Sequence, residues 1–103
     1  MTNIVEVISF SFSESKCKLV GELTRQAIMK IPKKSFKQIL AAQSLVLDLQ
    51  DVSRVDTAGL AWLFYLLEQA SGTRCQLSFS NIPDKLNKLI SLSGVEGFLP
   101  IDS

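Results

Sequence analysis

Residues 45–67, LVLDLQDVSRVDTAGLAWLFYLL, place a strand pattern directly before a helix pattern. Leu45–Leu49 is a compact apolar run that is typical of a strand buried on both faces. A polar loop follows, and Thr57–Ala70 then has helical periodicity, closed by Ser71 and Gly72. A buried strand that leads into a helix predicts a layered α/β domain with parallel strand pairing.

The N-terminal part of the chain predicts a hairpin. Ile8, Phe10 and Phe12 alternate with serines, which is the period-two pattern of a half-buried strand. A polar turn at Ser13–Lys16 separates this strand from a second one at Cys17–Leu23. A hairpin beside parallel strands makes the predicted sheet mixed.

The remaining predicted elements alternate between helix and strand. They are a helix capped by Thr24 that runs through Ile28 and Ile31 to Pro32, a helical piece around Phe36, Ile39 and Leu40, a strand at Gln76–Ser80, a helix from Pro83 to near Gly94, and a short edge strand at Phe98–Ile101. We therefore expect one α/β domain over residues 1–103. Its mixed sheet has four to five strands, an N-terminal hairpin and about three helices packed on it.

Composition excludes several classes of function. The chain has 11 basic and 10 acidic residues, so no overall charge draws it to nucleic acid. It contains no histidine, which removes Ser-His-Asp and Cys-His catalysis and the common zinc sites. Its glycines form neither GxxxxGK[ST] nor GxGxxG. We expect no catalytic residue, no metal and no cofactor.

The chain also lacks the usual marks of secretion or membrane insertion. Met1–Phe12 has no basic region and carries Glu6 within its apolar stretch, so it does not resemble a signal peptide. The apolar run Ala58–Leu67 is shorter than the roughly 20 residues that a spanning helix needs. Cys17 and Cys75 are far apart and are interpreted as free thiols in a reducing compartment. These features predict a cytoplasmic protein.

The start of the long helix is the candidate site. Asp56 or Thr57 can accept hydrogen bonds from the free N–H groups of the first turn. Ala58 and Gly59 are small and leave room for a close approach. Thr57 thus places a hydroxyl at the positive end of a helix, where a phosphate or a partner carboxylate is favoured. The alternative is that Asp56 and Thr57 are only a helix cap.

The long helix is apolar on two sides, and this predicts a second surface. The expected core stripe is Leu60, Leu63, Phe64 and Leu67. The residues assigned to the opposite side are Trp62, Tyr65, Leu66 and Gln69. A second apolar side is either covered by the same domain or binds a partner. We therefore add Trp62, Tyr65 and Leu66 to the candidate partner-binding residues.

Two segments of the chain carry a family resemblance. The first is Leu47–Leu49 followed by Val55–Leu60, and the second is Val20–Leu23. Both resemble the STAS family, which includes the anti-sigma-factor antagonists and the cytoplasmic tails of sulfate transporters. Ser53–Ala61 is especially similar to the small STAS subunits of the Mla phospholipid-transport complexes. The resemblance implies a single non-enzymatic STAS domain that docks onto a partner.

That branch implies a role in outer-membrane lipid asymmetry. The domain would bind the ATPase of an inner-membrane ABC transporter, with its membrane permease complex, on the cytoplasmic face of the bacterial inner membrane. Two alternatives stay open. One is an anti-sigma-factor antagonist switched by phosphorylation at Thr57, although that branch carries serine there. The other is a small-ligand binder that uses the loop from Asp51 to Thr57.

Four lysines form a cluster around Pro32. They are Lys30, Lys33, Lys34 and Lys37. The cluster is either a solvated helix face or a patch that faces anionic lipid or an acidic partner. The second alternative would give weak contact with a membrane surface and no span.

Overall fold

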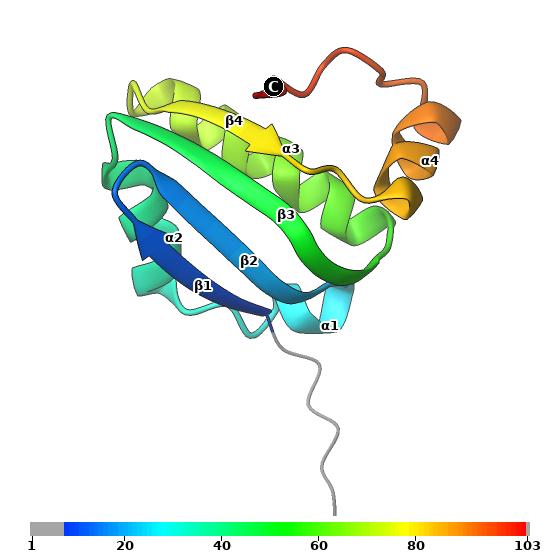
Figure 1. The fold of residues 1–103 in the computed structure, drawn as a ribbon, viewed down its shortest axis with the longest axis horizontal. Helices are drawn as coiled ribbons and strands as arrows, with labels where there is room; N and C mark the ends of the chain where they lie inside the picture. The colour runs from blue at the N-terminus through cyan, green and yellow to red at the C-terminus, as the bar shows by residue number, and fades with distance from the viewer. Residues whose placement is uncertain (1–7, 103) are drawn as a thin grey trace, which may run out of the picture.

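The computed structural model describes residues 8–102 as four strands and four helices in mixed order (Figure 1). The elements are β1 (Ile8–Ser13), β2 (Lys16–Leu23), α1 (Arg25–Ile28), α2 (Lys33–Ala41), β3 (Ser44–Val55), α3 (Thr57–Gly72), β4 (Gln76–Ser80) and α4 (Asp84–Ser93). Residues 1–7 and residue 103 lie outside the described part. Most of the segment that was compared with a signal peptide, residues 1–12, is therefore not described.

The strands form one sheet in the order β1-β2-β3-β4. β1 and β2 pair antiparallel through a turn at Glu14 and Ser15, and Glu14 adopts a left-handed φ of 53°. β2 pairs parallel with β3, and β3 pairs parallel with β4. The predicted hairpin and mixed sheet are therefore confirmed, with four strands. The expected edge strand at Phe98–Ile101 is reduced to a single bridge between Phe79 and Ile101.

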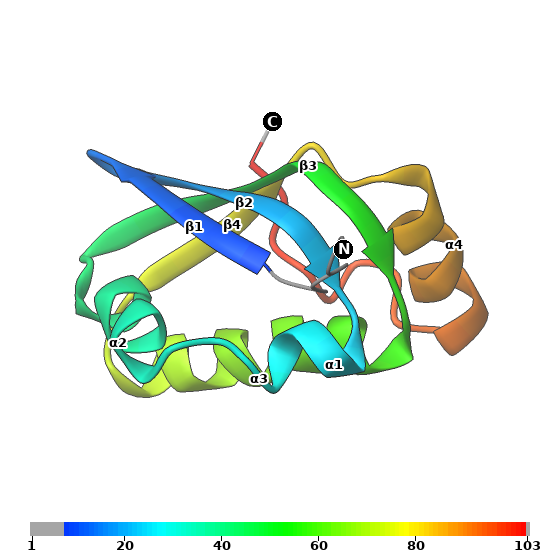
Figure 2. The same ribbon diagram turned by 90° about the horizontal axis from the view of Figure 1, so that it is seen from below.

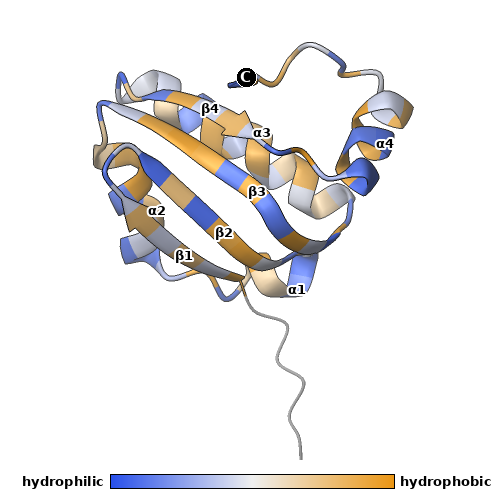
Figure 3. Ribbon diagram, viewed as in Figure 1, coloured by the Kyte–Doolittle hydropathy of each residue, from blue (hydrophilic) through white to orange (hydrophobic). Residues whose placement is uncertain are grey.

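The molecule has two layers, because α1, α2 and α3 all lie on one face of the sheet (Figure 2). The strand side chains on that face form the core; they include Cys17, Leu19, Leu45, Leu47, Leu49, Leu77 and Phe79. The apolar run of β3 predicted burial on both faces. This prediction is wrong, because only one face of β3 is buried. Val46 and Asp48 point away from the core and are partly exposed. Hydrophilic and hydrophobic residues alternate along β2 in Figure 3.

Most helix boundaries follow the expected end signals, but α1 ends at Ile28, and the expected continuation through Ile31 to Pro32 is wrong. The Thr24 side chain accepts a hydrogen bond from the N–H of Ala27 at the start of α1. Pro32 precedes α2 and Pro83 precedes α4. Gly94 ends α4 in the left-handed conformation, with φ 71° and ψ 26°, which glycine adopts without steric cost.

Candidate functional site

The candidate site lies where β3 passes into α3, and the connection is much tighter than expected. β3 continues to Val55, and Asp56 alone separates it from α3, which begins at Thr57. The polar loop expected from Asp51 to Thr57 is therefore mostly strand. Polar residues in this stretch fit a strand because the outer face of the sheet carries no helix, so their side chains reach water.

Asp56 caps α3 and also bonds to the connection between β2 and α1. Its Oδ1 accepts a hydrogen bond from the N–H of Gly59 at 2.9 Å, and its Oδ2 accepts one from the N–H of Arg25 at 3.1 Å. Its own N–H donates to the carbonyl of Leu23 at 3.2 Å. One side chain thus fixes the start of α3 against the end of β2 and the start of α1.

Gly59 allows this junction to pack closely. It is buried, and a Cβ added there would lie 2.0 Å from the carbonyl oxygen of Leu23. No side chain fits in that gap. The absence of a side chain at Gly59 therefore allows α3 to pack against β2. Gly59 is buried beneath the candidate site and does not contribute to its surface.

Thr57 and Ala58 form the accessible part of the junction. Thr57 is exposed at the first helical position, and Ala58 is half-buried. The first turn of α3 contains no acidic residue. An exposed hydroxyl therefore stands at the positive end of a helix whose cap, Asp56, is already bonded within the domain.

The two sides of α3 differ from the predicted ones. The buried residues are Gly59, Leu60, Trp62, Leu63, Leu66 and Ala70. Leu66 is fully buried, with an exposed fraction of 0%, so it belongs to the core and not to a partner surface. Phe64 and Leu67, expected in the core stripe, are only partly buried. The exposed residues of α3 before its last turn are Thr57, Ala61, Tyr65 and Glu68.

Trp62 and Tyr65 have different environments. Trp62 is 9% exposed, and its ring centroid lies 6.3 Å from that of Phe10. Tyr65 is 51% exposed and stacks on Phe36 of α2, with centroids 5.7 Å apart and an interplanar angle of 22°. Of the two aromatic residues proposed as anchors, only Tyr65 presents substantial surface. Trp62 is covered by its own domain.

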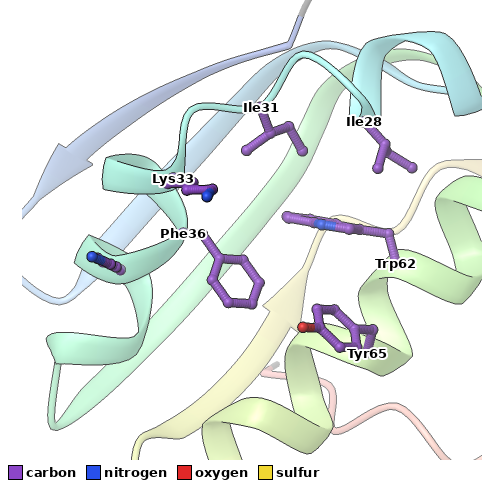
Figure 4. A pocket seen from close by; sticks show the side chains of 7 residues that line it. Ile28, Ile31, Lys33, Phe36, Trp62 and Tyr65 are labelled. Carbon is purple, nitrogen blue, oxygen red and sulfur yellow. The ribbon is translucent and has the colours of Figure 1, made fainter.

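Both rings line a cavity that the sequence did not reveal. It lies between α3 and the α1–α2 segment (Figure 4), has a volume of about 360 Å³ and is lined by Ile28, Ile31, Lys33, Phe36, Lys37, Trp62 and Tyr65. One local signal was available. Lys33, Phe36 and Lys37 have the i, i+3, i+4 spacing that places residues on one face of a helix. What that face meets depends on the position of α3.

The two cysteines are free thiols inside the core. Burial raises the pKa of the Cys17 thiol to about 11, although a backbone hydrogen bond with Ser11 acts in the opposite direction. Burial also raises the pKa of Cys75. Both thiols are therefore protonated and unreactive near neutral pH.

Residues 8–102 contain no group of three or more cysteine, aspartate or glutamate side chains that could hold a metal ion. Within the same residues, no helix has the length and hydrophobicity needed to cross a membrane.

Solved structures similar to this chain share its architecture. A protein from Thermotoga maritima, described as a candidate anti-sigma factor antagonist, superposes with a TM-score of 0.72 at 19% identity, covering 93% of this chain and 86% of its own. Unphosphorylated SpoIIAA, an anti-sigma factor antagonist, gives 0.69 at 17%, covering 93% and 87%. Phosphorylated SpoIIAA from Bacillus gives 0.65 at 15%, covering 93% and 90%.

These identities are low, so the structures establish the fold alone. A comparison with curated protein sequences finds no match. A family model described as Mlab, STAS domain matches residues 7–100. Because this match spans nearly the whole chain, the protein belongs to the STAS domain family, in the group described as Mlab.

Proposed function

We propose that this protein is a non-catalytic STAS subunit that binds the ATPase of an inner-membrane ABC transporter for phospholipid, and regulates or stabilises it. The domain lies in the cytoplasm, held at the inner membrane by the ATPase and its permease complex. The family model's description supports this assignment. The transported phospholipid would serve the lipid asymmetry of the outer membrane.

The observation that carries the proposal is the surface formed by Thr57, Ala61 and Tyr65. All three are exposed on one side of α3, while the opposite side of the helix packs on the sheet. Asp56 and Gly59 hold the start of this helix rigidly from below. A rigid helix face with small residues at one end and an aromatic ring further along suits a protein interface. We name this surface the α3 face.

The test places a charge at the exposed end of the α3 face. Thr57→Glu should fold normally, because a carboxylate near a helix N-terminus is tolerated electrostatically. A docked ATPase would have to desolvate that carboxylate, at a cost of several kcal/mol unless it is paired. We expect the variant to lose the ATPase in a pull-down while its thermal unfolding matches that of the wild type.

Thr57→Ser is the matched control, since it keeps the hydroxyl and should retain the ATPase. Equal capture of the ATPase by Thr57→Glu and the wild type would remove this end of α3 from the interface. Wild-type protein that captures no ABC ATPase would refute the proposed function itself.

A phosphorylation-switched anti-sigma-factor antagonist is the second candidate. The exposed hydroxyl of Thr57 favours it, because a kinase could reach this side chain. The similar structures include an anti-sigma factor antagonist in its phosphorylated form. Co-purification separates the two: a P-loop ATPase supports the first function, and a kinase-like anti-sigma factor supports the second.

A further inference from the structure

The cavity between α3 and the α1–α2 segment combines an apolar interior with a cationic rim. Five of its lining residues are apolar or aromatic, namely Ile28, Ile31, Phe36, Trp62 and Tyr65. The other two are Lys33 and Lys37 of α2. In Figure 4, the Trp62, Phe36 and Ile31 side chains converge on the same space, and Lys33 lies beside it. We name this cavity the aromatic pocket.

The α1–α2 segment, which supplies five of the seven lining residues of the aromatic pocket, carries charge of one sign. The stretch between Glu22 and Asp48 contains five basic residues and no acidic one, although the whole chain has a net charge of only +1. Pro32, the N-cap of α2, provides no side-chain cap, and the first turn of α2 has no acidic residue. Lys33 therefore lies at the positive end of α2, and no acidic side chain in the first turn neutralises the positive charge there. This environment favours an anionic group at the rim.

The volume sets the size of the occupant. The volume of about 360 Å³ is that of a small-molecule pocket. Pockets for small molecules range upward from about 300 Å³, and they are mostly apolar with a few charged groups that fix orientation. The aromatic pocket fits a compact ligand of this kind.

We infer that the aromatic pocket binds a small anionic amphiphile, with its apolar body between Trp62, Phe36 and Ile31 and its carboxylate or phosphate group at Lys33 and Lys37. A neutral ligand would leave the lysines without a counter-charge. An inorganic anion would leave the aromatic interior empty. The inference goes beyond the proposed function. Tyr65 belongs to both the α3 face and the pocket, but Thr57 does not line the pocket, so the Thr57 test and the octanoate test give separate results.

The protein contains its own reporter for this site. Trp62 is the single tryptophan of the chain and lines the pocket, so its fluorescence reports occupancy directly. Octanoate is the probe, and 1-octanol is the neutral ligand of equal chain length. We expect octanoate to bind saturably in both fluorescence and calorimetry. It should bind at least about tenfold more tightly than 1-octanol, the scale of one charge-assisted hydrogen bond.

Paired charge variants test the orientation of the ligand. Lys33→Gln with Lys37→Gln should weaken octanoate to the affinity of 1-octanol and leave 1-octanol unchanged. Lys85→Gln with Lys88→Gln removes the same net charge from exposed positions of α4, outside the pocket, and should leave octanoate binding intact. Thr57→Glu should also bind octanoate normally, which separates this result from the ATPase test.

Three outcomes would overturn the inference. The first is the absence of saturable octanoate binding in both measurements. The second is 1-octanol binding as tightly as octanoate, or the α4 variant losing as much affinity as the α2 variant. The third is lysine-dependent binding to phosphatidylglycerol vesicles or to an acidic peptide without octanoate binding. That result would assign Lys33 and Lys37 to a membrane or protein surface.

Discussion

Gly59 shows how a single missing side chain can position a binding surface. Its α-carbon lies so close to β2 that an added Cβ would come within 2.0 Å of the Leu23 oxygen. Asp56 bonds to the same junction through the Gly59 and Arg25 N–H groups. Gly59→Ala should therefore lower the free energy of unfolding by at least about 2 kcal/mol, within the range of overpacked sites. Chemical denaturation measures the change.

Gly72→Ala is the matched control, because Gly72 lies in the same helix and a Cβ there meets nothing within 4 Å. Alanine is the better helix former by about 1 kcal/mol, so this variant should match or exceed wild-type stability. Equal stability of the two variants would mean that α3 shifts away from Leu23 at little cost, and that the close approach is not needed.

At the scale of elements, α3 has neighbouring residues with opposite roles. Leu66 is fully buried, while Tyr65 is half exposed and contacts Phe36. Leu66→Ala should cost about 2–5 kcal/mol of stability, the range for buried leucines. Tyr65→Ala should cost no more than about 1.5 kcal/mol, the upper value for an aromatic pair. It should weaken ATPase binding by about 2 kcal/mol, the hot-spot scale.

Unfolding curves and ATPase titrations of the two variants test this division of α3. The comparison uses Leu66→Ala at a temperature where it remains folded. If folded Leu66→Ala binds more weakly than Tyr65→Ala, the partner does not contact the α3 face through Tyr65. The unfolding curves and the ATPase titrations would then indicate that α3 contributes to stability and not to partner binding.

At the scale of the whole molecule, the two thiols report on the integrity of the core. Cys17 lies on β2 and Cys75 lies just before β4, and both are buried between the layers. We expect neither to react with a disulfide reagent at pH 8 in the native protein, and both to react in denaturant. Rapid labelling of native Cys17 would show that the hairpin opens without global unfolding.

The same thiol predicts a dependence of stability on pH. Burial raises the pKa of Cys17 from 9.0 to about 11, so the folded state holds this proton more tightly than the unfolded chain does. Its contribution is complete below pH 9 and is lost as the pH rises toward 11. Denaturation at pH 8 and pH 10.5 should show a decrease in stability that is smaller in Cys17→Ala, which keeps only the buried thiol of Cys75. An equal decrease in that variant would assign the effect to other groups.

Local patterns in the chain are sufficient to predict the elements. Alternating apolar residues predict β1, and Thr24, Pro83 and Gly94 mark helix ends that the structure confirms. Each of these features depends only on residues a few positions apart, so it can be recognised from one segment of the sequence. The STAS resemblance adds the family, and the matching family model confirms it.

Side-chain environment depends on which elements meet, and a local pattern does not contain that information. The apolar run of β3 predicts burial on both faces, yet the helices lie on only one. The periodicity of α3 places Leu66 outside, and the sheet buries it. Lys33 and Trp62 lie almost 30 residues apart and share one cavity because α2 and α3 pack on the same face. The core and the aromatic pocket are consequences of long-range packing, because burial requires a second surface from elsewhere in the chain.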